Sequence, residues 1–126
     1  MPLSASNAAT VVDSGLVLSA VEFAMGRQLT AEQSLQAVLS FQPDNVLAEF
    51  NLGVLYYAGH REGLAEQHWQ RTLVLDPSFG EAHRTLCYLF YTQKQFAEAL
   101  RHAERAQGLG VDIPRELVDE LVRATN

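Results

Sequence analysis

The sequence repeats at an interval of 34 residues, and this interval restricts the possible folds more than any other feature of the chain. It separates Ala31, Ala65 and Ala99. It also relates leucines, aromatic residues, small residues, aliphatic residues and prolines: Leu18, Leu52 and Leu86; Phe23, Tyr57 and Tyr91; Ser19, Gly53 and Cys87; Val21, Leu55 and Leu89; Pro43 and Pro77. A helix pair of this size cannot bury its own apolar face, so the pattern predicts repeated units that stack and share a core.

Local signals favour helices joined by tight turns. Thr30 followed by Gln33 predicts a capping box that opens a helix running to about Phe41. Gly26 and Gly59 fall at closely matching positions, 33 residues apart, where the first helix of a pair is expected to end and turn into the second. No segment shows the alternation that predicts a strand.

Prolines mark further helix ends. Pro43 and Pro77 are expected to follow the second helix of their units. Asp112 before Pro114 predicts the start of a last helix that runs to about Ala124. Its apolar residues form a single stripe, which indicates a helix that covers the end of the third unit: Leu117, Val118, Leu121 and Val122.

The middle unit carries a known pattern. Its residues stand at the spacings of the tetratricopeptide (TPR) repeat: Leu52, Gly53, Tyr56, Ala65, Trp69 and Pro77. The chain therefore resembles TPR proteins, over about Val12 to Val111. The outer units depart from the pattern at several positions: Ser19, Glu22 and Leu35 in the first, and Cys87, Phe90, Ala103 and Val111 in the third.

The resemblance implies an all-α fold, namely a right-handed α-solenoid of three TPR-like helix hairpins with a C-terminal capping helix, about seven helices in total. Residues 1–12 are expected to form a flexible N-terminal tail. The repeats are expected over 13–111 (about 12–45, 46–79 and 80–111), and the capping helix over 112–126.

In TPR proteins the first helix of each pair lines a concave groove. These helices are expected at Asp13–Met25, Val46–Ala58 and Gly80–Thr92. The resemblance implies the following groove residues: Leu16, Ala20 and Phe23 in the first unit, Leu47, Phe50, Asn51, Val54 and Tyr57 in the second, and Glu81, Arg84, Thr85, Tyr88 and Tyr91 in the third. Such an aromatic-rich trough with one cation is suited to an apolar or amphipathic peptide segment.

One subclass of TPR proteins holds the C-terminal carboxylates of Hsp70 or Hsp90 with Lys, Asn, Asn, Lys and Arg. In this chain the corresponding positions hold Leu16, Ala20, Asn51, Glu81 and Thr85. Only Asn51 matches, and an acid stands where a cation belongs. The sequence therefore argues against binding of a chaperone tail.

Composition excludes several classes of partner. The net charge is −6 and Lys94 is the single lysine, so a nucleic-acid partner is not expected. No stretch reaches the ~20 apolar residues that span a bilayer, and the segment from Met1 to Asp13 has no signal-peptide pattern. A cytoplasmic protein without a membrane partner is therefore expected.

The sequence offers no constellation for catalysis. The histidines form no metal-binding motif: His60, His68, His83 and His102. Cys87 is the only cysteine and falls at the small-residue position of its unit, which favours a packing role over a nucleophilic one. We therefore expect no enzymatic activity, no cofactor and no metal.

Three functional hypotheses remain open. The first is an adaptor or scaffold that binds a peptide segment of another protein in the groove. The second is a structural TPR module that forms homo-oligomers through the groove or the repeat ends, because no polar helix precedes Asp13. The third is a small secretion-type chaperone that shields a client segment, a role that no residue of this sequence distinguishes from the first.

Overall fold

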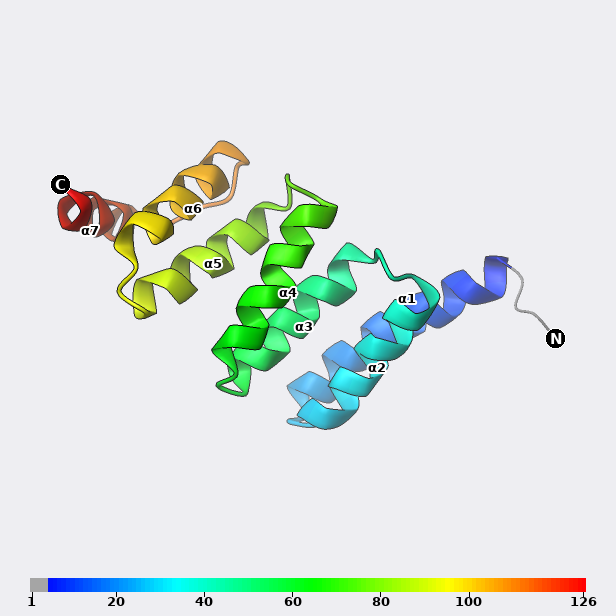
Figure 1. Ribbon diagram of the computed structural model, residues 1–126. Helices are drawn as coiled ribbons and strands as arrows, with labels where there is room; N and C mark the ends of the chain where they lie inside the picture. Colours follow the sequence, from blue (N-terminus) through cyan, green and yellow to red (C-terminus); the bar gives the residue numbers. More distant parts are fainter. Residues whose placement is uncertain (1–4) are drawn as a thin grey trace. The chain divides into compact units, whose positions relative to one another are not determined.

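The computed structural model describes the backbone of residues 5–126, and the side chains of Val12 and of residues 14–126. Within this part the chain is all-helical, with seven helices and no strand (Figure 1). They are α1 (Ala5–Ala24), α2 (Gln28–Phe41), α3 (Val46–Ala58), α4 (Glu62–Leu75), α5 (Gly80–Thr92), α6 (Phe96–Gly108) and α7 (Arg115–Thr125). The chain forms two compact units, 1–68 and 69–126, and the boundary falls within α4.

Most predicted helix boundaries are close to the observed ones, and two first helices match at both ends. Val46–Ala58 and Gly80–Thr92 are confirmed as α3 and α5. Helix α1 begins at Ala5 and not at Asp13, so the segment predicted as a tail is helical from Ala5 onward, and residues 1–4 lie outside the described part. The alanines Ala5, Ala8 and Ala9 favour helix in this segment, which the prediction of a tail did not weigh.

The predicted capping box at Thr30 is wrong. Helix α2 begins at Gln28, with Arg27 in the N-cap position and no side-chain cap. The Thr30 hydroxyl lies inside the helix and donates a hydrogen bond to the Arg27 carbonyl, at 3.2 Å. The preceding turn, and not the threonine, sets the start of the helix. The last helix likewise begins at Arg115, after Pro114, and not at Asp112.

The turns within the helix pairs repeat the same backbone geometry. Gly26, His60 and Lys94 have left-handed φ angles of 76°, 61° and 61°, and they lie one repeat apart. At His60 the amide donates to Tyr57 (3.1 Å) and the next amide, that of Arg61, donates to Tyr56 (2.8 Å), as in a Schellman motif. The helix end predicted at Gly59 is confirmed, since Gly59 is the C-cap residue of α3, but its φ is −88° and the left-handed residue of the turn is the next one, His60.

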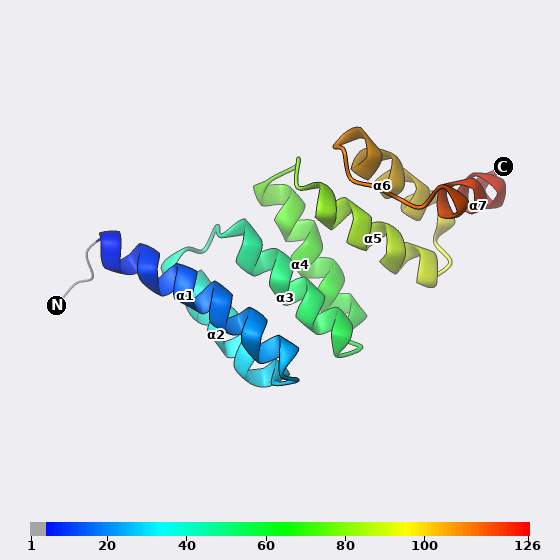
Figure 2. The same ribbon diagram turned by 180° about the vertical axis from the view of Figure 1, so that it is seen from behind.

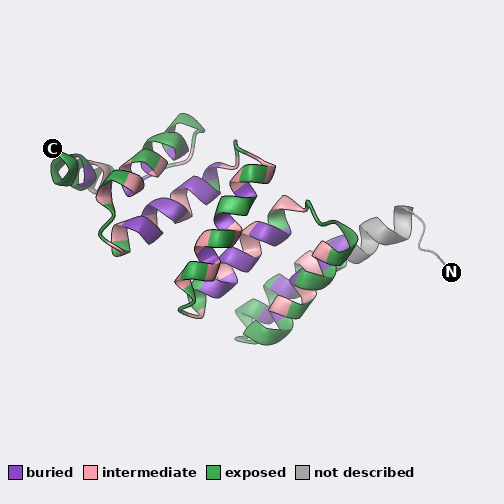
Figure 3. Ribbon diagram, viewed as in Figure 1, coloured by how far each residue is buried: buried purple, intermediate pink, exposed green. Residues whose placement is uncertain are grey.

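In the first unit, α1 lies antiparallel along α2, and α2 packs against α3 (Figures 1 and 2). The helices of the first pair approach closely at Gly15, where an added Cβ would lie 2.6 Å from the Val38 methyl. Helix α3 is buried along most of its length (Figure 3). The core of this unit consists mainly of small and aliphatic residues: Val12, Ala31, Leu35, Val38, Ala48, Leu52, Leu55 and Ala65.

In the second unit, α5 packs against α6, and α7 packs against α6 (Figure 1). Leu121 of α7 is fully buried, whereas Asp119, Glu120 and Arg123 on the same helix are exposed. Helix α7 therefore covers α6 with its apolar stripe. Among the described helices, none combines the length and the apolar character that crossing a bilayer requires.

The left-handed turns give a test of the backbone argument. We expect His60→Gly and Lys94→Gly each to raise the free energy of unfolding by about 0.5 to 1 kcal/mol, because a left-handed φ costs a residue with a Cβ more than it costs glycine. Gly26→Ala is the reciprocal control and should lower it by about 1 kcal/mol. Urea unfolding monitored by circular dichroism measures all three, and unchanged or reduced stability of both glycine variants would contradict this account.

Candidate functional site

A pocket in the first unit brings together residues of three helices. Its volume is about 170 Å³. Four predicted groove residues line it, Ala20 and Phe23 from α1 and Asn51 and Val54 from α3. Three further residues complete it: Ser19, Leu35 and Leu55. The lining is thus apolar except for one amide and one hydroxyl, and this pocket is the candidate functional site.

Helix periodicity explains why these side chains meet. Ala20 and Phe23 are three residues apart on α1, and Asn51 and Val54 are three residues apart on α3, so each pair shares a helix face. The Ser19 hydroxyl donates to the Leu16 carbonyl at 2.8 Å and is therefore already bonded within α1. Asn51 is half-buried, and no hydrogen bond joins its side-chain amide to another described residue.

The other predicted groove residues of the first unit do not line this pocket. Leu16 and Phe50 are half-buried, whereas Leu47 is 50% exposed. Tyr57 is 37% exposed, as is Phe23 at the pocket. These residues offer apolar surface on the same two helices without adding to the pocket wall.

In the second unit, several predicted groove residues bond to one another or to their own helix. Arg84 pairs with Glu81, one turn earlier on α5, with an Nε–Oε2 distance of 3.4 Å. The Thr85 hydroxyl donates to the Ala82 carbonyl at 3.0 Å. Tyr88 is half-buried. The cation predicted for the trough is thus partly neutralised by an acid of the same helix.

Tyr91 contacts the last two helices of the second unit. Its hydroxyl donates to Glu120 of α7 at 2.9 Å, and its ring lies edge-on to Phe96 of α6 with centroids 6.0 Å apart. The bond to Glu120 raises the pKa of Tyr91 above its ordinary value. Sequence reasoning missed this contact because it joins residues of different helices outside the repeat. A single trough shared by Phe23, Tyr57 and Tyr91 stays a prediction.

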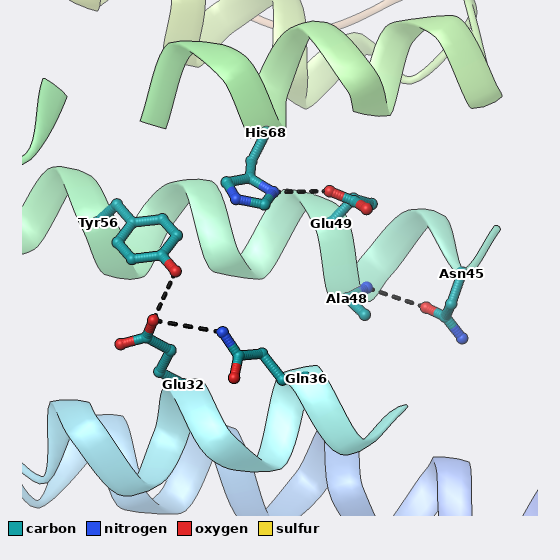
Figure 4. A network of polar contacts seen from close by, with 7 residues as sticks. All are labelled: Glu32, Gln36, Asn45, Ala48, Glu49, Tyr56 and His68. Atoms are coloured by element: carbon teal, nitrogen blue, oxygen red, sulfur yellow. Dashed lines mark hydrogen bonds and ion pairs between the residues drawn. The ribbon is translucent and has the colours of Figure 1, made fainter. Parts of the chain in front are cut away.

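A polar network holds the helices of the first unit in register (Figure 4). His68 of α4 pairs with the buried Glu49 of α3 at 2.7 Å and stacks on Tyr56 with ring centroids 5.2 Å apart. The Tyr56 hydroxyl donates to Glu32 of α2 at 2.6 Å, and the Arg61 guanidinium lies 5.1 Å from the centre of the tyrosine ring. Burial and the bond to Glu32 raise the pKa of Tyr56 to about 12. These residues link α2, α3 and α4, and none of them lines the candidate site.

In the second unit, two histidines stand one repeat after Glu49 and His68. His83 of α5 and His102 of α6 face each other with their Nδ1 atoms 3.0 Å apart. Nε2 of His83 lies 3.4 Å from the Pro77 carbonyl. If that nitrogen donates to the carbonyl, Nδ1 of His83 accepts from Nδ1–H of His102, so the ring of His83 is neutral. His102 also stacks on Phe90, with ring centroids 5.5 Å apart.

Both histidines resist protonation. Burial, His83 and Arg101 lower the pKa of His102 from 6.5 to about 4. Burial, with a smaller contribution from Arg105, also lowers the pKa of His83, although the Pro77 carbonyl acts in the opposite direction. Within the described residues, no group of three or more His, Cys, Asp or Glu could hold a metal ion.

Cys87 occupies a packing position in the second unit. Its side chain is fully buried, and burial raises the pKa of the thiol to about 11. A thiol with this pKa is protonated at neutral pH and is a poor nucleophile. The arrangement therefore favours the packing role expected from the small-residue position that Cys87 shares with Ser19 and Gly53.

The pocket residues that the sequence did not predict are Ser19, Leu35 and Leu55. Leu35 is on the second helix of its pair, and the groove prediction considered only first helices. The sequence did carry a signal for Leu35, because it stands one repeat before Trp69, at a position where the repeat has a large apolar side chain. Leu55 belongs to one of the repeated aliphatic sets, but the groove prediction does not include it.

Solved structures with similar folds cover most of the chain. One is the Yersinia enterocolitica type III secretion chaperone SycD in complex with a peptide of the translocator YopD, with a TM-score of 0.80 and 15% identity over 90% of this chain and 94% of that one. Another is the first TPR of Spaghetti (RPAP3) bound to an HSP90 peptide, with a TM-score of 0.75 and 18% identity over 98% of this chain and 94% of that one.

A third similar structure is a mutant O-GlcNAc transferase from Thermobaculum terrenum, with a TM-score of 0.76 and 25% identity. The match covers 86% of this chain but only 20% of the transferase, so this chain spans a fifth of that protein's length. No protein-family model and no curated protein sequence matches this chain. The similarity to these structures shows the fold.

The histidine pair predicts how stability depends on pH. Between pH 6.5 and about 4 the unfolded chain takes up a proton at His102 that the folded chain does not, so the free energy of unfolding should fall as the pH falls through this window. In His102→Gln the decrease should be smaller, because glutamine does not titrate and its amide can still donate to His83.

Urea unfolding at a series of pH values tests this prediction. His60→Gln is the matched control, since His60 is exposed and lies outside the pair. It should keep the pH dependence of the wild type. If His102→Gln and the wild type showed the same pH dependence, the loss of stability at low pH could not be attributed to His102.

Proposed function

Because this chain has the fold of TPR proteins, we propose that it is a protein-interaction module that binds an apolar or amphipathic peptide segment at the pocket between α1 and α3. The observation that supports the proposal most strongly is the convergence of Ala20, Phe23, Asn51 and Val54 around one mainly apolar cavity. Two of the similar structures, SycD and Spaghetti, hold peptides. The proposal includes no catalytic step.

The size of the pocket indicates what part of a ligand enters it. An apolar cavity of about 150 Å³ accepts a benzene molecule, and this pocket measures about 170 Å³. It therefore fits one large side chain, such as leucine, methionine or phenylalanine. The half-exposed ring of Phe23 would lie beside that side chain and increase the apolar area removed from water.

Asn51 supplies the polar contact that an inserted peptide needs. A side-chain amide can donate and accept hydrogen bonds at once, as a peptide group does. Asn51 lines the pocket wall, within the same cavity that would receive the side chain of the bound segment. We propose that this contact orients the peptide, while the pocket supplies most of the binding free energy.

Charge favours a neutral or basic ligand over an acidic one. The chain has a net charge of −6, and no pocket residue is a cation. Arg84, the cation predicted for the trough, is paired with Glu81. The similarity to Spaghetti therefore extends to the fold and not to an acidic peptide ligand. A secretion-type chaperone would bind a particular client segment in the same way, so it is a special case of this proposal. A cytoplasmic location stays a prediction.

Selection from a displayed library of random peptides tests the proposal and requires no natural partner. We expect the selected peptides to share one large apolar residue and to bind the purified chain in fluorescence anisotropy. Val54→Glu should weaken binding by at least ~30-fold, because it places a charge in the apolar pocket. Ala20→Met should also weaken binding, because it fills the pocket while leaving the fold intact.

Val74→Glu is the matched control, since Val74 is 76% exposed and does not line the pocket. It should bind the selected peptides as the wild type does, and circular dichroism should show equal helicity in all variants. Peptides that bind Val54→Glu and Ala20→Met with wild-type affinity would show that this pocket is not the site.

A further inference from the structure

The outer face of α1 carries an apolar stripe that the proposed function does not use. We define it by four side chains, Ser14, Leu18 and Val21 on α1 and Met25 in the turn directly after it. Leu18, Val21 and Met25 are 52%, 49% and 59% exposed. The buried residues Val12, Ser19 and Glu22 and the pocket residues Ala20 and Phe23 occupy other positions around α1. The stripe is thus separate from both the core and the pocket.

The repeat shows what kind of partner covers such a face. Ser14, Leu18 and Val21 correspond, one repeat later on α3, to residues that are almost fully buried. These are Ala48, Leu52 and Leu55, whose exposed fractions are 0%, 1% and 5%. Helix α2 packs against α3, and Leu55 lines one pocket with Leu35 and another with Leu29. On α3, therefore, this face is covered by a helix, and on α1 the same face is open.

The spacing of the stripe also fits a helix as its partner. The intervals of four, three and four residues from Ser14 to Met25 are those of a heptad seam, in which two helices pack side by side. No member of the stripe is charged. Two copies of the stripe can therefore face each other without like-charge repulsion.

We infer that the stripe is the surface through which two copies of this chain associate, α1 against α1. Among the described helices, α1 carries the largest group of exposed large apolar residues, so a second α1 is the best match that the chain offers. Helix α2 is already packed on α1 and α3, and α7 presents a charged outer face. An interface of one face with itself is the usual arrangement in a twofold dimer.

Sedimentation equilibrium of the whole chain over a wide concentration range tests this inference. The wild type should be a dimer in equilibrium with a monomer. Leu18→Glu combined with Val21→Glu should weaken the association by at least ~100-fold, because like charges then face each other across the interface. Leu18→Lys combined with Val21→Lys should weaken it equally.

A mixture of the two charged variants identifies the partner surface. If the stripe faces a second copy of itself, the glutamate and lysine variants should associate with each other although neither associates alone. Val74→Glu, a charge at an exposed valine of α4, should leave the wild-type dimer intact. Because the substituted positions are exposed, circular dichroism should show unchanged helicity.

Three results would overturn the inference: a wild type that stays monomeric at every concentration, a dimer that survives both pairs of charges, or charged variants that fail to associate when mixed. The pocket variant Val54→Glu should remain dimeric, so a failure of the peptide-binding proposal is distinguishable from a failure of this one.

Discussion

The close approach of α1 and α2 is the constraint on which the packing of the first unit depends. At Gly15 there is no room for a Cβ against Val38, so α1 and α2 meet where the sequence has no side chain. Ala31, Ala65 and Ala99 are fully buried at equivalent positions of the second helices. Small residues at these points let the helix backbones approach each other closely.

The repeat predicted the helices well because its regular spacing reflects which side chains must pack between the helices. Helices α3 and α5 were predicted at their observed bounds. The end of α3 was predicted correctly at Gly59, but the left-handed residue of the turn is His60, because glycine is preferred for a left-handed φ without being required. The start of α1 was missed because the prediction relied on apolar periodicity, which the alanine-rich segment lacks.

The candidate site could be predicted only in part. Ala20, Phe23, Asn51 and Val54 follow from the helix face that the TPR resemblance assigns, and the structure brings them together. Contacts between different helices, such as that of Tyr91 with Glu120, depend on the tertiary arrangement and leave no periodic trace in the sequence. The position shared by Glu49 and His83 illustrates the same limit, since the repeat keeps the contact while its chemistry changes from a histidine–carboxylate contact to a histidine pair.

The central claim is that the packing of α1, α2 and α3 creates a binding pocket for an apolar side chain. Methyl NMR of the whole chain, recorded during titration with a selected peptide, tests it most directly. The account predicts that the largest shifts and intermolecular contacts fall on the methyl groups of Leu35, Val54 and Leu55. Shifts confined to Leu18, Val21 and Met25, or to methyl groups of the second unit, would contradict it.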